Sequence, residues 1–167
     1  LPESASIPFF EGFESFTNLN GPEWTVVDHG NNAKFELDGT VGLSSNKSVK
    51  LANFGQSAGN FDELMSSAVD LSVLGSSDLV TLSFRYAYRK RASGNYEKLM
   101  VMVTNNCGET WVQRKTITGN LLSNIVETAS WAPSSDEEWT TVHITTPVIT
   151  TAYFVENFRY KFVFESD

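Results

Sequence analysis

The residue types that most often carry out catalysis are scarce in this sequence of 167 residues. Its only cysteine is Cys107, and its only histidines are His29 and His143. A single cysteine excludes an internal disulfide and a cysteine-rich zinc site, and two histidines leave little for a histidine-based metal centre or a proton relay. Cys107 also precedes Gly108 and Glu109 in a predicted turn, and acidic surroundings do not favour a reactive thiolate.

Paired carboxylates would indicate a glycoside hydrolase, because such enzymes place two carboxyl groups beside the scissile bond. The run Asp136-Glu137-Glu138 follows a proline and two serines, a composition typical of a loop. Asp62 and Glu63 are adjacent at the start of a predicted strand, so their side chains point to opposite faces. We therefore expect no enzymatic activity, and a glycan-cleaving sandwich enzyme is the weakest alternative.

Two aromatic residues lie in predicted loops, where their rings could stack on the CH groups of a sugar. Trp131 lies two residues before a proline, and Tyr96 directly follows a Gly-Asn pair. The other tryptophans, Trp24, Trp111 and Trp139, are expected in the core, because alternating strands place such residues on the inner face. A carbohydrate ligand would therefore bind at Trp131 and Tyr96.

The composition is that of one folded domain with an acidic surface. Hydrophobic residues make up 41% of the chain and charged residues 19%, so extensive disorder is not expected. A total of 12 Lys and Arg residues against 20 Asp and Glu residues gives a formal net charge of −8. This charge repels phosphate backbones, which makes nucleic acids and anionic membranes poor partners. No apolar run reaches the ~20 residues that a membrane span needs.

Alternation of apolar and polar residues is the strongest structural pattern. Residues 81–88 and 158–165 alternate in this way, as expected of half-buried strands. Further strands are expected at 23–27, 34–37, 48–52, 63–69, 98–103, 111–116 and 139–146. The best helical segment, 121–128, has two turns at most. Many short strands separated by Gly, Asn and Ser clusters predict an all-β sandwich or barrel.

The chain is predicted to form a single domain at residues 8–167, preceded by a linker at residues 1–7. Prolines and serines at the start do not suit a central strand, which suggests a module cut from a longer chain. The basic run 89–91 interrupts the acidic sequence. It could contact the carboxylates of a partner, but such a run is more often a solvated loop that protects a strand edge.

An ordered set of short motifs covers nearly the whole chain. The motifs are PFFEGFE (8–14), WTVVD (24–28), DELMSSAVDLS (62–72), LSFRYAY (82–88) and LMVMVTNNCGETW (99–111), with Trp139 before a Thr-rich strand. This set resembles the jelly-roll accessory domain that follows the catalytic domain in secreted pappalysin-type metallopeptidases of Bacteroidetes. It is more distantly similar to the cleaved adhesin domains of gingipains and to MAM domains. The resemblance implies a non-catalytic jelly-roll β-sandwich of two antiparallel sheets in a secreted or cell-surface protein.

The resemblance also implies a structural calcium ion (Ca²⁺) near the first and last strands. Ca²⁺ binds six to eight oxygens, which loops rich in Asp, Asn and Gly can supply. The candidate ligands are Glu11, Glu14, Asp28, Asn31 and Asn46. The alternative is that the two glutamates are solvated charges at strand ends and that the asparagines only form turns.

Two features depart from the pattern of this family. Phe35 stands where relatives usually have Trp, and relatives usually continue past the position of Asp167 into a final strand with an Asp-Asp pair. We therefore expect the domain at 8–167 to lack its last strand. The calcium site would then be incomplete, and an unpaired edge would invite pairing with another chain.

The sequence thus predicts an accessory or adhesion-like domain of a larger secreted or cell-surface bacterial protein, by resemblance a metallopeptidase. Its partner would be a protein, a glycan or an adjacent domain of the same chain. The alternative is a carbohydrate-binding module that tethers an enzyme to polysaccharide.

Overall fold

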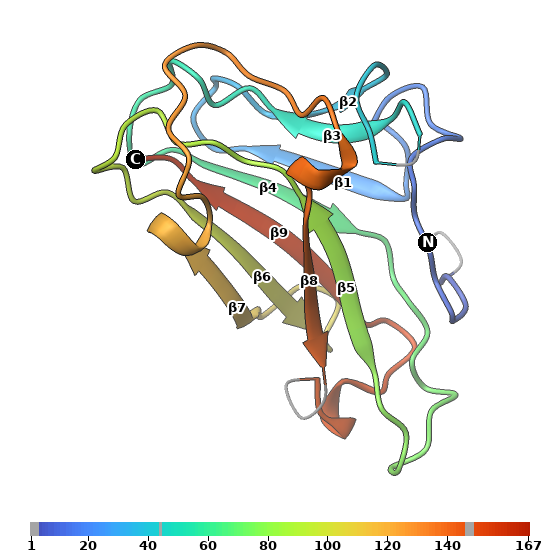
Figure 1. Cartoon of the computed structure of the whole chain (residues 1–167). Helices are drawn as coiled ribbons and strands as arrows, with labels where there is room; N and C mark the ends of the chain where they lie inside the picture. Colours follow the sequence, from blue (N-terminus) through green and yellow to red (C-terminus); the bar gives the residue numbers. More distant parts are fainter. Residues whose placement is uncertain (1–3, 44, 146–148) are drawn as a thin grey trace.

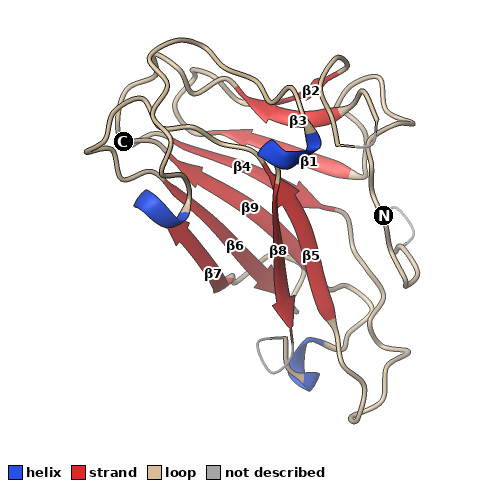
Figure 2. Ribbon diagram, in the orientation of Figure 1, coloured by secondary structure: helices blue, strands red, loops and turns tan. Residues whose placement is uncertain are grey.

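The structure is a computed structural model that describes residues 4–43, 45–145 and 149–167. These residues form nine strands and three short 3-10 helices, and they contain no α-helix (Figures 1 and 2). The strands are β1 (Trp24–Asp28), β2 (Phe35–Asp38), β3 (Ser48–Leu51), β4 (Phe61–Ser66), β5 (Thr81–Tyr86), β6 (Lys98–Thr104), β7 (Val112–Thr118), β8 (Thr140–Thr145) and β9 (Arg159–Glu165). The 3-10 helices are η1 (Gly119–Leu121), η2 (Asp136–Glu138) and η3 (Thr151–Tyr153). The predicted all-β sandwich is confirmed; residue 146, the last of the strand predicted at 139–146, lies outside the described residues.

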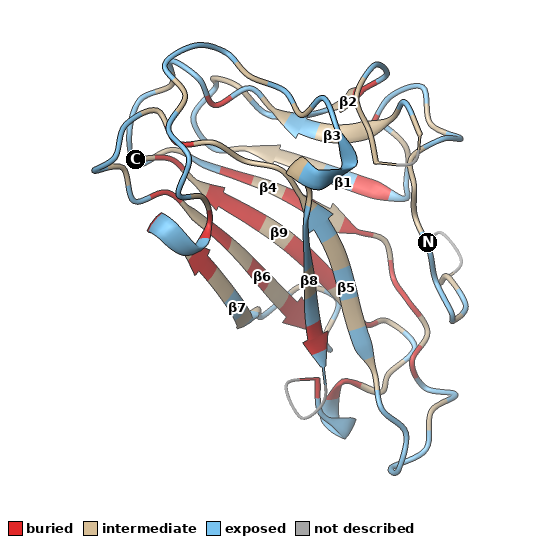
Figure 3. Cartoon of the chain, viewed as in Figure 1, coloured by how far each residue is buried: buried red, intermediate tan, exposed pale blue. Residues whose placement is uncertain are grey.

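Five strands form one continuous antiparallel sheet in the order β1-β4-β9-β6-β7. The central strand β9 pairs Phe162 with Leu64 on one side and with Val101 on the other. Strand β6 alternates between the two faces, and its inward residues Val101 and Val103 are 0% exposed. This sheet therefore carries the best-buried part of the core, drawn in red in Figure 3.

The facing layer consists of two separate two-stranded sheets, β2-β3 and β5-β8. In Figure 1, β5 and β8 run in front of the five-stranded sheet, and β2 and β3 lie above it. Each of these four strands has one hydrogen-bonded neighbour strand among the described residues. Ile144 of β8 is buried in the core, whereas most of the other apolar residues of this layer pack against the core but stay half-buried: Phe35, Leu37, Val49, Leu51, Leu82, Phe84 and Val142. A layer divided in this way leaves several strand edges unpaired.

The best helical candidate of the sequence, 121–128, does not form a helix. Only η1 is helical there, and the following segment is extended and pairs in parallel with Lys90. The amide of Lys90 donates to the carbonyl of Ile125 at 2.9 Å, and the amide of Glu127 donates to the carbonyl of Lys90 at 2.7 Å. These tertiary bonds replace helical ones, and local periodicity cannot reveal them.

Part of the segment predicted as a linker at 1–7 is docked on the sandwich. Residues 1–3 lie outside the described part of the chain. Ala5 donates its amide to the carbonyl of Ala68 at 2.9 Å and accepts the amide of Asp70, also at 2.9 Å. The chain is therefore already paired with the sandwich a few residues before the predicted domain start.

Candidate functional site

The long connection between β7 and β8 forms a surface that we call the loop platform. It comprises residues 119–139 and the facing segment 89–97; in Figure 1 the orange trace between η1 and η2 is its main part. The two backbone bonds to Lys90 tie its middle to the chain that follows β5. The Tyr86 hydroxyl donates to the carbonyls of Leu121 and Leu122 at 3.3 and 3.2 Å. The loop is thus fastened along its length.

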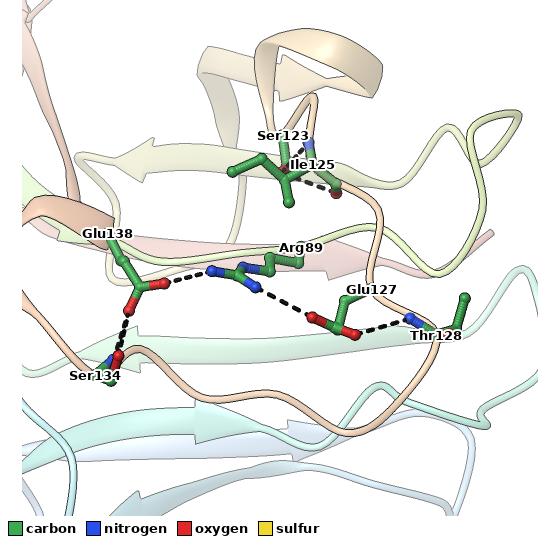
Figure 4. Close-up of polar contacts among 7 residues, drawn as sticks. All are labelled: Arg89, Ser123, Ile125, Glu127, Thr128, Ser134 and Glu138. Atoms are coloured by element: carbon green, nitrogen blue, oxygen red, sulfur yellow. Dashed lines mark hydrogen bonds and ion pairs between the residues drawn. The ribbon is translucent and has the colours of Figure 1, made fainter.

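Arg89 is the centre of the polar contacts in the loop platform (Figure 4). Its Nη1 donates to Glu127 Oε2 at 3.1 Å, and its Nη2 donates to Glu138 Oε1. The guanidinium also lies 4.3 Å from the centroid of the Trp131 ring. One side chain therefore fixes the loop at three separated points and forms ion pairs with two carboxylates.

Glu138 is held on its other side by the start of η2. Its Oε2 accepts the amide and the hydroxyl of Ser134 at 2.6 and 3.1 Å and the amide of Ser135 at 3.3 Å. The hydrogen bond from the Ser134 amide, together with the other donors and the charge of Arg89, lowers the pKa of Glu138. Glu138 therefore stays ionised, opposite Arg89, at a lower pH than a free glutamate does.

Four large apolar side chains of the loop platform, Val126 among them, face solvent, and three of them are more than half exposed. Leu121 is 79% exposed, Tyr96 59% and Ile125 51%. The Tyr96 ring packs beside Gly119, where a β-carbon would lie only 2.8 Å from the ring. The Ser123 hydroxyl accepts the amide of Ile125 at 3.2 Å, which fixes the turn that presents this residue. Apolar groups on a fixed backbone lose little entropy on binding, which suits a protein ligand.

The two aromatic residues predicted to bind a sugar both belong to the loop platform, but they differ in exposure. Trp131 is half-buried, and Arg89 covers one face of its ring, whereas Tyr96 is open to solvent. Sugar stacking at these residues stays a prediction. Among the three tryptophans predicted in the core, Trp24 is buried, whereas Trp111 and Trp139 are only half-buried.

The basic run 89–91 is not the solvated loop that the sequence suggests. Lys90 is buried, and its Nζ donates to Asn120 Oδ1 at 2.7 Å. Arg91 donates to the carbonyl of Gln56 at 2.6 Å. The expectation was wrong because the partners of these cations lie far away in the sequence, where no local pattern marks them.

The first two residues predicted to bind Ca²⁺ lie in the opening segment. Glu11 folds back on its own backbone, because its Oε1 accepts the amide of Phe13 at 2.6 Å. Glu14 is exposed, and its carbonyl accepts the Lys47 ammonium at 2.9 Å. A cation is thus already present at this segment, in the form of a lysine side chain.

The other predicted ligands are distributed over two sites. Asp28 and Asn31 line a groove of about 780 Å³ along β1 and β2. Asn46 instead lines a smaller hollow beside Trp139. Among the described residues, no group of three or more His, Cys, Asp or Glu side chains could hold a metal ion. Binding of Ca²⁺ by the predicted set of five stays a prediction.

A second carboxylate, which the sequence prediction did not include, lies opposite Asp28. Asp28 and Asp62 are direct partners in the register of β1 and β4. Asp62 is 3% exposed, and its Oδ1 has no hydrogen-bond partner in the described structure. Burial, and then the charge of Asp28, raises the pKa of Asp62 to about 6. Strand register brings these residues together, and the sequence alone does not give that register.

The structure also contains a hydrogen bond between the side chains of a serine and a histidine. Ser83 Oγ and His143 Nδ1 lie 2.7 Å apart on the paired strands β5 and β8. Both side chains are exposed, and neither lines the groove or the hollow described above. Nucleophilic catalysis also needs a group that orients the base and a place for the substrate. The pair is therefore explained as a cross-strand hydrogen bond.

No protein-family model matches the sequence, and no curated protein matches it. None of the helices in the described part of the chain is long and apolar enough to cross a membrane. Among solved structures, the chain is similar to the K2 cleaved adhesin domain of Lys-gingipain, with a TM-score of 0.59 and 18% sequence identity over 95% of this chain and 96% of that chain. At this identity the similarity concerns the fold, and it agrees with the distant resemblance to cleaved adhesin domains seen in the motifs.

Proposed function

We propose that this chain is a non-catalytic, adhesion-like accessory domain of a larger secreted or cell-surface bacterial protein. Its loop platform would bind another protein or an adjacent domain of the same chain. The observation that carries the proposal is the exposure of Leu121, Tyr96 and Ile125 on a loop that Arg89 and Lys90 hold in place. The adhesin fold of the similar structure supports it. A metallopeptidase parent belongs to the same proposal and rests on the resemblance of the motifs.

The chemistry of the loop platform suits a partner with an apolar patch. Apolar and aromatic side chains at the centre, surrounded by polar groups, are the usual arrangement of a protein interface. Arg89 is already paired with Glu127 and Glu138, so its charge needs no carboxylate from a partner. Affinity would therefore come mainly from apolar burial and depend weakly on salt.

The test compares variants of the purified domain on a panel of immobilised extracellular proteins and polysaccharides. The double variant Leu121→Asp/Ile125→Asp places charges on the loop platform. The matched control, Val73→Asp/Leu79→Asp, alters two residues in the loop before β5 that are 70% and 78% exposed. We expect a protein on the panel to bind the wild type and the control alike and to bind the platform variant at least tenfold more weakly.

Two results would contradict this proposal. The carbohydrate alternative would replace it if a polysaccharide were bound and binding were lost in Trp131→Ala and Tyr96→Ala. Hydrolysis of a glycan or peptide by the pure domain, abolished by changing one carboxylate, would show that it is an enzyme.

A further inference from the structure

We propose that the outer edge of β1 binds an extended peptide segment of another protein, which adds a strand to the five-stranded sheet. The peptide has apolar residues at alternate positions and a basic residue beside Asp28. In Figure 1, β1 lies between β4 and the pair β2-β3, and the groove along β1 and β2 follows it. The site shares no residue with the loop platform.

The register of β1 shows which of its backbone groups point away from β4. Just before β1, Glu23 lies opposite Ser67, and its carbonyl accepts the Ser67 amide at 2.7 Å. Hydrogen-bonded pairs recur at every second residue of an antiparallel ladder, so the odd-numbered residues of β1 bond to β4. The amides and carbonyls of the even-numbered residues, Val26 and Asp28 among them, therefore point to the outer edge.

Two of these outward-pointing positions are open to a partner. Trp24 is buried, whereas Val26 and Asp28 are half-buried. No residue in the described part of the chain accepts a backbone hydrogen bond from the amide of Val26 or of Asp28. The edge thus presents donors and acceptors at the two-residue spacing with which a further β-strand bonds.

The groove beside this edge is shaped for an extended chain. Consecutive residues of β1 (24–26) and of the chain around β2 (34–37) line it. Successive strand residues point to opposite faces, so a groove lined by all of them runs along the strand edges. The half-buried side chains of Val26, Phe35 and Leu37 give it an apolar surface. Alternate side chains of a bound peptide would cover this surface.

The volume of the groove limits the ligand to a short segment. It measures about 780 Å³. This value lies within the range of roughly 300–1,000 Å³ that is usual for ligand pockets. The groove therefore holds a few residues of a strand rather than the side of a folded domain.

Sequence distinguishes this edge from the opposite edge of the same sheet. Strand β7 carries Arg114 and Lys115, and cations on an edge strand discourage pairing. Strand β1 has the sequence WTVVD, with no Lys, Arg or Pro, and its three central residues are β-branched. Of these two edges, β1 is therefore the one suited to accept a strand.

The charges beside the groove favour a basic peptide. Asp28 and Glu36 line it, together with a single lysine, Lys34. Asp62, opposite Asp28 in the register with β4, adds a buried carboxyl group. The chain as a whole has a formal net charge of −8. A Lys or Arg of the peptide is attracted to Asp28, and an acidic peptide is repelled.

The test selects random heptapeptides displayed on phage against the full chain and measures the enriched peptides, made synthetically, by fluorescence anisotropy. We expect them to alternate apolar and polar residues and to carry a Lys or Arg. Val26→Pro removes an outward-pointing amide that is not part of the β4 ladder, and it should weaken binding at least tenfold. Val26→Thr keeps the amide and the shape; this matched control should bind like the wild type.

Two further measurements do not depend on the folding of Val26→Pro. Methylation of alternate backbone nitrogens of the peptide should abolish binding for one of the two alternate sets, because that set faces β1. Hydrogen exchange at the amides of Val26 and Asp28 should slow when the peptide binds to the wild type.

Three results would overturn the proposal. The first is that no peptide is enriched. The second is that the enriched peptides tolerate both sets of methyl groups and leave exchange at Val26 and Asp28 unchanged. The third is a wild-type dimer in analytical ultracentrifugation that Val26→Pro dissociates, which would show that the edge binds a second copy of this chain. The platform variant Leu121→Asp/Ile125→Asp should bind the peptides normally, so the two proposals fail separately.

Discussion

The two layers of the sandwich differ in how completely they bury their apolar residues. In the five-stranded sheet, Val101 and Val103 have no exposed surface. In the facing layer, Leu82 and Phe84 are half-buried, and every second residue of β5 is exposed (Figure 3). In a sheet of five strands, neighbouring strands shield each other's backbone and side chains from water, and two separate pairs of strands do so less completely. Global stability therefore resides in the five-stranded sheet, and the facing layer can open locally.

In the divided layer, four strands have one hydrogen-bonded neighbour strand each among the residues that the structure describes: β2, β3, β5 and β8. A strand added to β3 or β5 would cover half-buried residues such as Leu51 and Phe84. Within the described part of the chain, the five-stranded sheet has its two edge strands at β1 and β7.

The largest effect should come from a cavity in the five-stranded sheet. Leu64→Ala removes a buried side chain from β4, and we expect a loss of about 2–5 kcal/mol in the free energy of unfolding. Leu82→Ala, in the half-buried strand β5, should cost about 1 kcal/mol, because part of its surface is already in water. Chemical denaturation of both variants measures the difference. Equal losses would show that the two layers contribute alike.

A smaller effect should follow from releasing the loop platform. Arg89→Ala removes the stacking on Trp131 and the ion pair with Glu127, and we expect a loss of about 1 kcal/mol. Limited proteolysis should cut within 119–139 faster in this variant. Arg85→Ala, an exposed arginine on β5, is the control and should change neither quantity. Unchanged proteolysis in Arg89→Ala would mean that Arg89 does not hold the loop.

The smallest effect concerns pH. The pKa of Glu138 is lowered from its ordinary value of 4.5, mainly by the Ser134 amide, so its ionised form stabilises the folded state above that pH. This contribution is lost as the pH falls through the lowered pKa. The difference in Tm between wild type and Glu138→Gln should therefore be present at neutral pH and vanish in strong acid. The exposed neighbour Glu137→Gln should show no such convergence; a constant Glu138→Gln difference would contradict the assignment.

Most of the fold could be predicted because alternation is a local property. The alternating residues at 81–88 and 158–165 correspond to β5 and β9, and the turn residues between strands exclude long helices. The helical candidate at 121–128 is not helical, because backbone hydrogen bonds to Lys90 hold residues 125–127 beside another segment. Where a distant segment supplies the hydrogen bonds, local propensity loses its predictive value.

The sites were less predictable than the fold, because they depend on contacts between distant residues. Trp131 and Tyr96 were recognised as loop residues, but the arginine that covers Trp131 lies 42 positions away in the sequence (131 − 89). Asp28 was recognised as a candidate ligand, whereas its partner Asp62 follows only from the register of β1 and β4. Register and loop docking are tertiary properties, and one sequence does not specify them.

Hydrogen exchange of the native domain, resolved by segment, tests the difference between the layers most directly. We predict the slowest exchange in β4, β6 and β9, faster exchange in β2, β3, β5 and β8, and protected amides at Lys90 and Glu127 within the loop platform. Uniform protection across both layers, or rapid exchange at Lys90 and Glu127, would contradict a rigid sheet that supports a fastened binding loop.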